Sequence, residues 1–593
     1  MNPAWKNTDL EQQILDTISL DEPWALVEQF STIVRLSGSP EEAEAVAAIT
    51  NKLAGWNIPF EVHHPTCLIS LPGPATLRTT GDNAKSYTVK TPSFSPHTSG
   101  KEIEAELVYV PGHQAAGINE LFSEQRTATD VDLRGKIVMT EGLGIAARGF
   151  DLAASGAVAA LFINPGNRIH EGITTTTWGS PDLDSLGRVP PVPILTINNP
   201  DGRELIAQLQ QGPVTVAFSN RTDTGWRPIP VIVAEIAGNR FPDEFVLFHG
   251  HLDSWHIGIG DNATGDATLL ELARVFKQHE AALDRTLRVA WWSGHSHGRY
   301  AGSTWYADQY AHDLARNCVA HINVDSPGCR WATVYENVAW MSEAEGFCQN
   351  VIRDITGKES SGEGHVLRAG DCSFNNLGVT TYFMLSSTMP QDLVDEKGYY
   401  PVGGCGGNIA WHTEDDTMEI ADRDNLLRDI RVYAATIIRS VNAPVAPFDY
   451  RATLDEIAAA VDRYSTTADG VIDLAPTSEA ITFLRSALDA FYAQTASVDP
   501  NDDAAVRAAN ATQRAIARAL VTLCYTRDGR FQQDPARAIP SVPDLAFAQQ
   551  LPDADDNMRH VITNQLRRGQ NRVIWELDQI RATVEQAMTN SPL

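Results

Sequence analysis

Two continuous apolar runs, Val246-Leu-Phe and Leu287-Arg-Val-Ala-Trp-Trp292, most constrain how this chain of 593 residues can fold. Such runs are typical of strands that are buried on both faces, and helical stretches separate them along the chain. Alternation of this kind predicts an α/β fold with a mostly parallel sheet and helices on both faces. Because ligands bind beyond the carboxyl ends of such strands, the residues after each run are the first candidates for a functional site.

Histidine and aspartate residues follow the predicted strands, each in a loop just after an apolar run or in the glycine-rich turns nearby. They are His251, Asp253, Asp261, Asp325 and His412. One such residue at a strand end is usually a cap or a turn former, whereas four in this context indicate a metal site. Two neighbouring divalent ions need a bridging carboxylate, with imidazole and carboxylate ligands on each side. We expect Asp253 to orient the imidazole of His251.

The distribution of residue types along the chain predicts three domains. Residues 1–95 and 231–445 are expected to form the α/β domain, and 96–230, with short β-like runs between glycines and prolines, an inserted α+β domain. Residues 446–593 are expected to be helical, with long breaker-poor segments over 504–523 and 564–588. In the first domain, Ser39 before a proline is expected to cap a helix.

The strand-end motifs carry a family resemblance. The runs that carry it are His251-Leu-Asp253-Ser-Trp, Gly260-Asp261-Asn-Ala-Thr-Gly, Asn323-Val-Asp325-Ser and Trp411-His412-Thr. In this order they resemble the co-catalytic zinc peptidases of the aminopeptidase and glutamate carboxypeptidase family. By that resemblance His251, Asp261 and Asp325 would hold one ion, with Asp261 bridging, and His412 would hold the second.

The resemblance extends over nearly the whole chain. The insert, with Asp132-Leu-Arg-Gly-Lys-Ile and Ala153-Ala-Ser-Gly-Ala, is similar to a protease-associated domain. With its helical C-terminal domain, the layout resembles the transferrin-receptor branch of the family, which implies a homodimer formed through the helical domain. A solvated helical cap is the alternative.

The departure from the family is the segment Gly294-His-Ser-His-Gly298. The family carries a pair of glutamates here, of which the first is the general base and the second a metal ligand. Aligned from Gly294 and Gly298, the pair becomes His295-Ser296, with one extra residue before Gly302. Aligned backward from Gly302, it becomes Ser296-His297. The sequence leaves both registers open.

Imidazole can take over both glutamate roles, since it binds zinc, iron, copper or nickel and is the commonest general base near neutral pH. In an extended segment, His295 and His297 would project to one side. We therefore expect His297 to be a metal ligand beside His251, Asp261, Asp325 and His412. His295, with Asp253, is expected to be catalytic, with His295 as the base or as an additional ligand. Zinc is the expected metal, as one or two ions, with iron, copper or nickel as alternatives.

Composition limits the partners. The formal net charge of −29 argues against nucleic acid and anionic membranes, which both require a positive face. No apolar run of about 18 residues predicts a membrane span, and no secretory signal is evident. The seven cysteines are dispersed and include no Cys-x-x-Cys pair, which favours reduced thiols and a cytoplasmic location.

These observations predict a metal-dependent hydrolase of an amide or related C–N bond, acting on a small-molecule or peptide-like substrate. Two alternatives stay open. One is a non-catalytic receptor-like or scaffold protein, and the other is a lyase or redox enzyme with a mononuclear, histidine-rich metal site.

Overall fold

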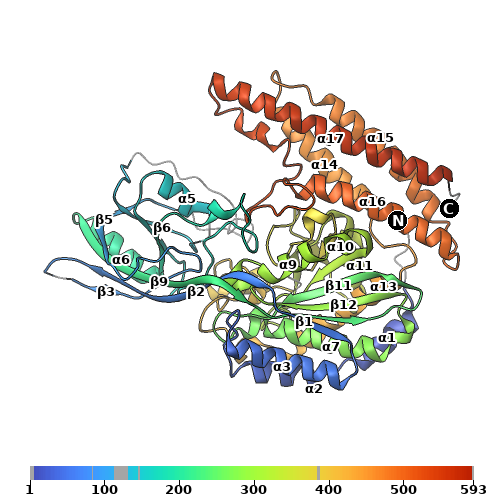
Figure 1. Ribbon diagram of the computed structural model, residues 1–593, viewed down its shortest axis with the longest axis horizontal. Coiled ribbons are helices and arrows are strands. Elements are labelled where there is room, and N and C mark those ends of the chain that lie inside the picture. Colours follow the sequence, from blue (N-terminus) through green and yellow to red (C-terminus); the bar gives the residue numbers. More distant parts are fainter. Residues whose placement is uncertain (1–5, 83, 113–130, 145–146, 384–386, 591–593) are drawn as a thin grey trace.

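The computed structural model describes residues 6–82, 84–112, 131–144, 147–383 and 387–590, which form three parts (Figure 1). A sheet flanked by helices holds the predicted site residues. A second sheet lies beside it, and a group of long helices lies over one side. None of the described helices has the length and apolar character needed to cross a bilayer.

The first sheet has six strands and is parallel except at one edge, which confirms the predicted fold class. Its order is β1 (Phe60–His63), β10 (Val231–Ile236), β12 (Arg285–Trp292), β11 (Phe241–His251), β13 (Cys318–Asn323) and β16 (Thr380–Tyr382). The two strands β1 and β10 run antiparallel to their neighbours, while β12, β11, β13 and β16 pair in parallel. The carboxyl ends of the parallel strands therefore meet at one edge.

Helices cover both faces of this sheet. Alternate residues of β11 face opposite sides: Val246 and Phe248 pack in the core under the N-terminal helices, whereas Phe245 and Leu247 pack toward Tyr306. The helices of this part are α1 (Thr8–Thr17), α2 (Asp21–Phe30), α3 (Pro40–Gly55), α7 (Thr264–Gln278), α9 (Ala301–Gln309), α10 (Ala311–Asn317), α11 (Glu345–Thr356), α12 (Gln391–Lys397) and α13 (Arg423–Asn442).

The predicted cap of α3 is present. Ser39 is its N-cap residue, and its hydroxyl accepts a hydrogen bond of 3.0 Å from the backbone N–H of Glu42. Pro40 occupies the first turn, where its missing N–H leaves no helical bond unmade.

The second sheet has eight strands. Its order is β3 (Ser86–Tyr87), β2 (Thr66–Thr79), β9 (Val214–Pro228), β5 (Ile103–Tyr109), β6 (Ile137–Glu141), β7 (Ala159–Ile163), β8 (Ile194–Ile197) and β4 (Val89–Lys90), with helices α5 (Ala147–Ala154) and α6 (Asn199–Leu209). The sheet begins at Thr66, so the boundary that we placed between 95 and 96 falls after three of its strands. The long pairing of β2 with β9 draws residues 66–79 into this sheet.

The C-terminal part is helical, with α14 (Tyr450–Thr467), α15 (Ala475–Thr495), α16 (Asp503–Tyr525) and α17 (Asp556–Asn590). Buried and half-buried charges join it to the first sheet. Glu244 at the start of β11 accepts from Arg285 at 2.8 Å and from Arg514 of α16 at 2.7 Å. These helices therefore share a core with the α/β domain.

Candidate metal centre

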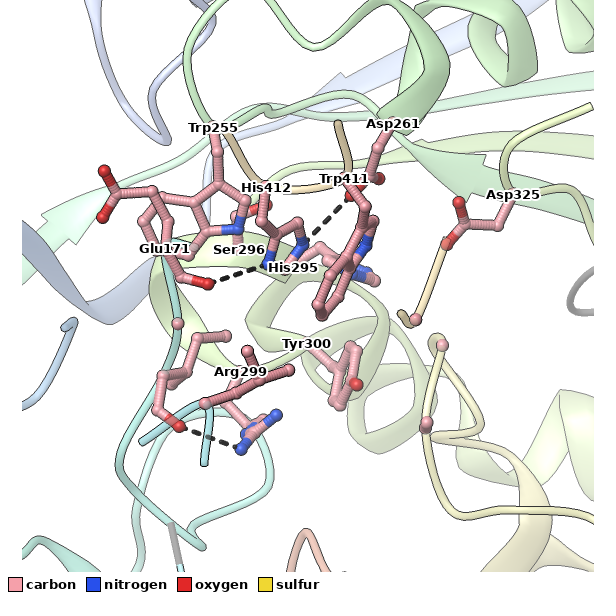
Figure 2. A pocket seen from close by; sticks show the side chains of 16 residues that line it. Glu171, Trp255, Asp261, His295, Ser296, Arg299, Tyr300, Asp325, Trp411 and His412 are labelled. Atoms are coloured by element: carbon pink, nitrogen blue, oxygen red, sulfur yellow. Dashed lines mark hydrogen bonds and ion pairs between the residues drawn. The ribbon is translucent and has the colours of Figure 1, made fainter. Parts of the chain in front are cut away.

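Four of the predicted site residues converge at the carboxyl edge of the first sheet. Three of them, Asp261, Asp325 and His412, line the cavity shown in Figure 2. His251 is the last residue of β11, and Asp325 follows the end of β13. Asp261 lies in the short turn η2 (Ile259–Ala263) that precedes α7. His412 comes from the loop between the 3₁₀ turns η6 (Cys405–Gly407) and η7 (Met418–Ile420). The loops after neighbouring strands thus assemble the site, as expected for an open α/β sheet.

The carboxylate of Asp261 lies between two imidazoles. Its Oδ1 is 2.9 Å from Nε2 of His251, and its Oδ2 is 3.0 Å from Nε2 of His412. Oδ2 of Asp325 lies 3.7 Å from the same Nε2 of His251. One carboxylate with an imidazole at each oxygen is the arrangement that a bridging ligand between two ions requires.

Both imidazoles are held with Nε2 toward this carboxylate. Nδ1 of His251 is 2.8 Å from the backbone oxygen of Asp253, and Nδ1 of His412 is 3.0 Å from that of Glu171. A carbonyl can only accept, so each Nδ1 carries the proton and Nε2 is left as a metal ligand.

The charges at the site are balanced for a cation. Burial alone would lower the pKa of His251, but Asp261 and Asp325 hold that pKa well above its usual value. Burial would likewise raise the pKa of Asp261, but the two imidazoles hold it well below the usual range. Nε2 of His251 is buried and has no hydrogen-bond partner among the described residues, although it lies only 2.9 Å from Oδ1 of Asp261. This set of buried nitrogen and oxygen atoms fits a divalent transition metal.

His295 joins this group from the altered segment. Its Nδ1 is 2.7 Å from Oδ2 of Asp371, and its ring stacks on that of His251 with centroids 3.7 Å apart. One ligand atom from each of His295, His251 and Asp325 lies within 4.8 Å of the others. Asp371 was not predicted as a site residue.

The structure does not bring His297 to the other predicted ligands. Residues 295–298 form one helical turn, α8 (His295–Gly298), rather than the extended segment that we assumed. Residues two apart on a helix point in nearly opposite directions, since each residue turns by about 100°. Nδ1 of His297 accordingly lies 2.9 Å from the Ser37 hydroxyl, away from the cavity. His295 and Ser296 line the cavity instead, which corresponds to the first of the two registers.

Asp253 lies behind this turn rather than in the cavity. Its carboxylate accepts hydrogen bonds from the backbone N–H groups of His295 at 3.2 Å and Ser296 at 2.9 Å, and from the Ser37 hydroxyl at 2.6 Å. Burial opposes ionisation, but the contact with His297 and the nearby imidazoles lowers the pKa of Asp253. Asp253 therefore positions the turn that carries His295.

A second buried carboxylate, Asp416, was not predicted. It accepts hydrogen bonds from the backbone N–H groups of Gly260 at 2.7 Å and Asp261 at 3.0 Å, and so fixes the turn that presents Asp261. Burial raises the pKa of Asp416 to about 7. The only sequence signal was its place in an acidic run four residues after His412, and acidic runs are usually solvated.

The cavity in front of these residues is small, with a volume of about 70 Å³. Trp411 stacks on His412 with ring centroids 3.7 Å apart, and Trp255 and Tyr300 add further aromatic walls. Glu171 and its neighbours Gly172 and Ile173 close the cavity from the part of the chain that carries the second sheet. Access to the site is thus set by two parts of the chain.

Comparison with known proteins gives a family match and relatives. Residues 231–437 match peptidase family M28. The probable glutamate carboxypeptidase VP8 of Zea mays is 25% identical over 263 residues, which cover 42% of this chain and 36% of that protein. Carboxypeptidase Q of Xenopus laevis is 32% identical over 107 residues, covering 18% and 21%. The matches thus span less than half the length of these relatives.

Solved structures share the fold. An aminopeptidase from Aneurinibacillus sp. strain AM-1 superposes with a TM-score of 0.53 at 19% identity, covering 72% of this chain and 95% of that one. A zinc aminopeptidase from Bacillus subtilis gives 0.51 at 17% identity, covering 72% and 95%. These structures show that the chain has the fold of such aminopeptidases, and the match to peptidase family M28 covers residues 231–437 of it.

Proposed function

We propose that this chain is a metal-dependent hydrolase that cleaves an amide bond in a small, peptide-like substrate. The observation that carries the proposal is the carboxylate of Asp261, placed between the Nε2 atoms of His251 and His412. The names of the matched relatives, which are carboxypeptidases and aminopeptidases, support the same class of reaction.

In this proposal His251, Asp261 and Asp325 hold one zinc ion, and Asp261 with His412 forms a second position. A bound divalent ion would polarise the substrate carbonyl and lower the pKa of a water molecule. Ser296 lies where the family places a carboxylate ligand, and its buried hydroxyl has no hydrogen-bond partner among the described residues. Because serine brings no charge, we expect the position at His412 to bind its ion more weakly.

His295 is proposed to transfer the proton. Asp371 accepts from Nδ1 of His295, which leaves Nε2 free to accept a proton from water and return it to the leaving amine. The carboxylate also stabilises the imidazolium that forms, as an orienting acid does in other histidine-dependent hydrolases. Asp253 contributes by holding the backbone of this turn.

The test combines metal analysis with variants of the full chain. We expect at least one stoichiometric zinc ion and amide hydrolysis that is lost on chelation and restored by zinc. Asp325→Ala and His412→Ala should reduce both metal content and turnover, whereas His312→Ala, at an exposed histidine, should change neither. Protein without stoichiometric metal, or variants that behave like the wild type, would favour the scaffold alternative and refute the proposal.

One observation favours a second candidate. His251, His295 and Asp325 are two imidazoles and a carboxylate around one point, the ligand set of mononuclear iron enzymes. That candidate predicts bound iron with a visible or paramagnetic signature, which zinc lacks. The double variant His295→Glu with Ser296→Glu separates the two, because it rebuilds the peptidase pair and should strengthen zinc binding at the His412 position.

Further proposals concern the other parts of the chain. We propose that the second sheet belongs to a protease-associated domain and that the helical part forms a homodimer. Phe483 and Trp575 are exposed on α15 and α17, with 55% and 63% of their surfaces accessible, and support such a contact. A monomeric mass in solution would refute the dimer. All seven cysteines are free and buried, which supports a cytoplasmic location.

A further inference from the structure

The loop that carries His412 is held by the part of the chain that contains the second sheet. Residues 168–171, between β7 and β8 and called here the β7–β8 segment, lie along residues 411–415. The N–H of Glu171 donates to the backbone oxygen of His412 at 2.8 Å, and Nδ1 of His412 donates to the backbone oxygen of Glu171 at 3.0 Å (Figure 2). One residue of the second-sheet part thus fixes both the backbone and the ring of a predicted metal ligand.

Two further contacts flank this pair. His170 is buried, its Nδ1 donates to the backbone oxygen of Trp411 at 2.6 Å, and its Nε2 accepts from the hydroxyl of Tyr400 at 2.8 Å. Arg168 donates to both carboxylate oxygens of Asp415 at 2.8 Å. Because the pair of Arg168 and Asp415 is exposed, it adds little to stability, and the buried contacts determine how the two segments meet.

Lys90 of β4 supplies a charge at this junction. Its Nζ lies 3.0 Å from the carboxylate of Glu171 in the β7–β8 segment and 2.7 Å from that of Glu414 in the His412 loop. Without the ammonium group, these two carboxylates would repel each other across the junction. His256 lies 3.2 Å from Glu171, so Glu171 keeps one partner when Lys90 is replaced. Lys90 therefore draws together the two segments that meet at Glu171 and His412.

The other imidazole at Asp261 is held differently. Nδ1 of His251 lies 2.8 Å from the backbone oxygen of Asp253, and both residues belong to the α/β domain. The acceptor for Nδ1 of His412 comes instead from the second-sheet part. Loss of such a hydrogen-bond partner behind a ligand costs about 10- to 100-fold in metal affinity. Displacement of the β7–β8 segment should therefore weaken metal binding at His412 and spare the position at His251.

We propose that the second-sheet part completes the metal centre, with Lys90 as the positioning residue that holds Glu171 against His412. Zinc affinity at the His412 position depends on this contact. Zinc bound there stabilises the contact in turn, because coupling between two sites is reciprocal. The inference rests on the metal site of the proposed function and names what controls one of its two positions.

The first test follows zinc binding to the metal-free, full-length chain by calorimetry. The parent protein carries His295→Glu with Ser296→Glu, because both positions are expected to fill in that variant. His412→Ala identifies which binding event belongs to the His412 position. Lys90→Met should weaken that event about 10- to 100-fold and leave the other unchanged.

Three variants test whether the charge of Lys90 is responsible. Lys90→Arg keeps the charge and should retain most of the affinity. Lys90→Met combined with Glu414→Gln should recover part of it, because only one carboxylate is then left at the junction. Lys136→Met is the matched control, since Lys136 is also half-buried but pairs with Glu106 within the second-sheet part, and it should behave like the parent.

Hydrogen exchange measures the contact itself, without metal and with the native residues at 295 and 296. Lys90→Met should speed the exchange of residues 168–171 and 411–415 by about 10-fold or more, and Lys136→Met should not. An equal loss of zinc affinity at both positions, no loss at either, or a single binding event in the parent overturns the inference. Exchange as slow in Lys90→Met as in Lys136→Met overturns it as well.

The two proposals fail separately, with hydrolysis followed on a panel of free and N-acetylated dipeptides. Zinc binding that depends on Lys90, in a chain that cleaves none of them, supports the inference and removes the hydrolase. Zinc-dependent cleavage, with zinc binding at His412 unchanged by Lys90→Met, leaves the hydrolase and removes the inference.

Discussion

Replacing Glu456 by glutamine removes one charge from the junction between the helical part and the α/β domain. Glu456 lies on α14, and its carboxylate is 2.6 Å from Nδ1 of His365. It also accepts from the hydroxyls of Ser342 at 2.6 Å, Ser541 at 2.6 Å and Tyr525 at 2.7 Å. Nε2 of His365 is 2.7 Å from the backbone oxygen of Ile539, so this histidine joins segments of both parts.

The size of the effect follows from the pKa of Glu456. Burial would raise it, but the hydrogen bond and charge of His365 and the surrounding hydroxyls lower it from 4.5 to about 2. Since one pKa unit is worth about 1.4 kcal/mol, the ionised carboxylate contributes about 3 kcal/mol to stability at neutral pH. A depressed pKa gives stability that is complete above about pH 4.5 and is lost as the pH falls toward about 2.

The assay is urea unfolding of the full chain from neutral pH down to about pH 3, for the wild type, Glu456→Gln and the control Glu479→Gln. Glu479 is an exposed residue of α15, so its replacement should have little effect at any pH. The free-energy difference between wild type and Glu456→Gln should be about 3 kcal/mol near neutrality and should shrink below about pH 4.5. A difference that is independent of pH, or a variant as stable as the control at neutral pH, would refute the reasoning.

Four further outcomes are expected. Asp371→Asn should lower kcat by about 10- to 100-fold and alter the pH profile of turnover, because His295 loses its orienting carboxylate. A pH profile that is unchanged in a steady-state assay would count against this role of Asp371. Glu244→Ala should lower the free energy of unfolding by about 3–5 kcal/mol in urea titrations, because it removes the carboxylate that the buried guanidinium of Arg285 shares with the half-buried one of Arg514. Gly302→Ala should destabilise the fold by about 1–3 kcal/mol in thermal unfolding, because its Cβ would lie 2.4 Å from the backbone oxygen of Ser293. Chelation should lower the melting temperature and excess zinc should restore it, by an amount equivalent to about 3 kcal/mol when the free metal is about a hundredfold above its Kd.

The sequence predicted the parts of this protein that depend on local pattern. Continuous apolar runs predicted the parallel strands. The structure brings His251, Asp261, Asp325 and His412 together because residues after such strands share one edge of the sheet. The second sheet was placed too late, because residues 66–79 belong to it only through pairing with a strand about 150 residues away. The residue sequence of β2 alone does not indicate a pairing with so distant a strand.

The orientation of the altered segment could not be predicted in the same way. His295 and His297 lie on opposite sides because Asp253 and Ser37, both distant in sequence, hold the segment as a helical turn. Glycines flank this segment, so its own residues favour neither a strand nor a helix. Asp371 and Asp416 were missed for a related reason, since a buried carboxylate is recognised only by the N–H groups or imidazole that it meets in the fold.

The charges of the cavity bear on the number of metal ions that it can hold. Asp261 and Asp325 line the cavity and, among the described residues, form ion pairs with imidazoles only, whereas Glu171 is paired with Lys90. One divalent ion would balance the charges of these two carboxylates. A second ion would leave the centre strongly positive, because Ser296 and His295 provide no carboxylate where the family has two. We therefore expect one ion in the wild type. In the double variant His295→Glu with Ser296→Glu we expect a second zinc ion, which metal analysis of the purified protein measures; a single ion in that variant would contradict this charge argument.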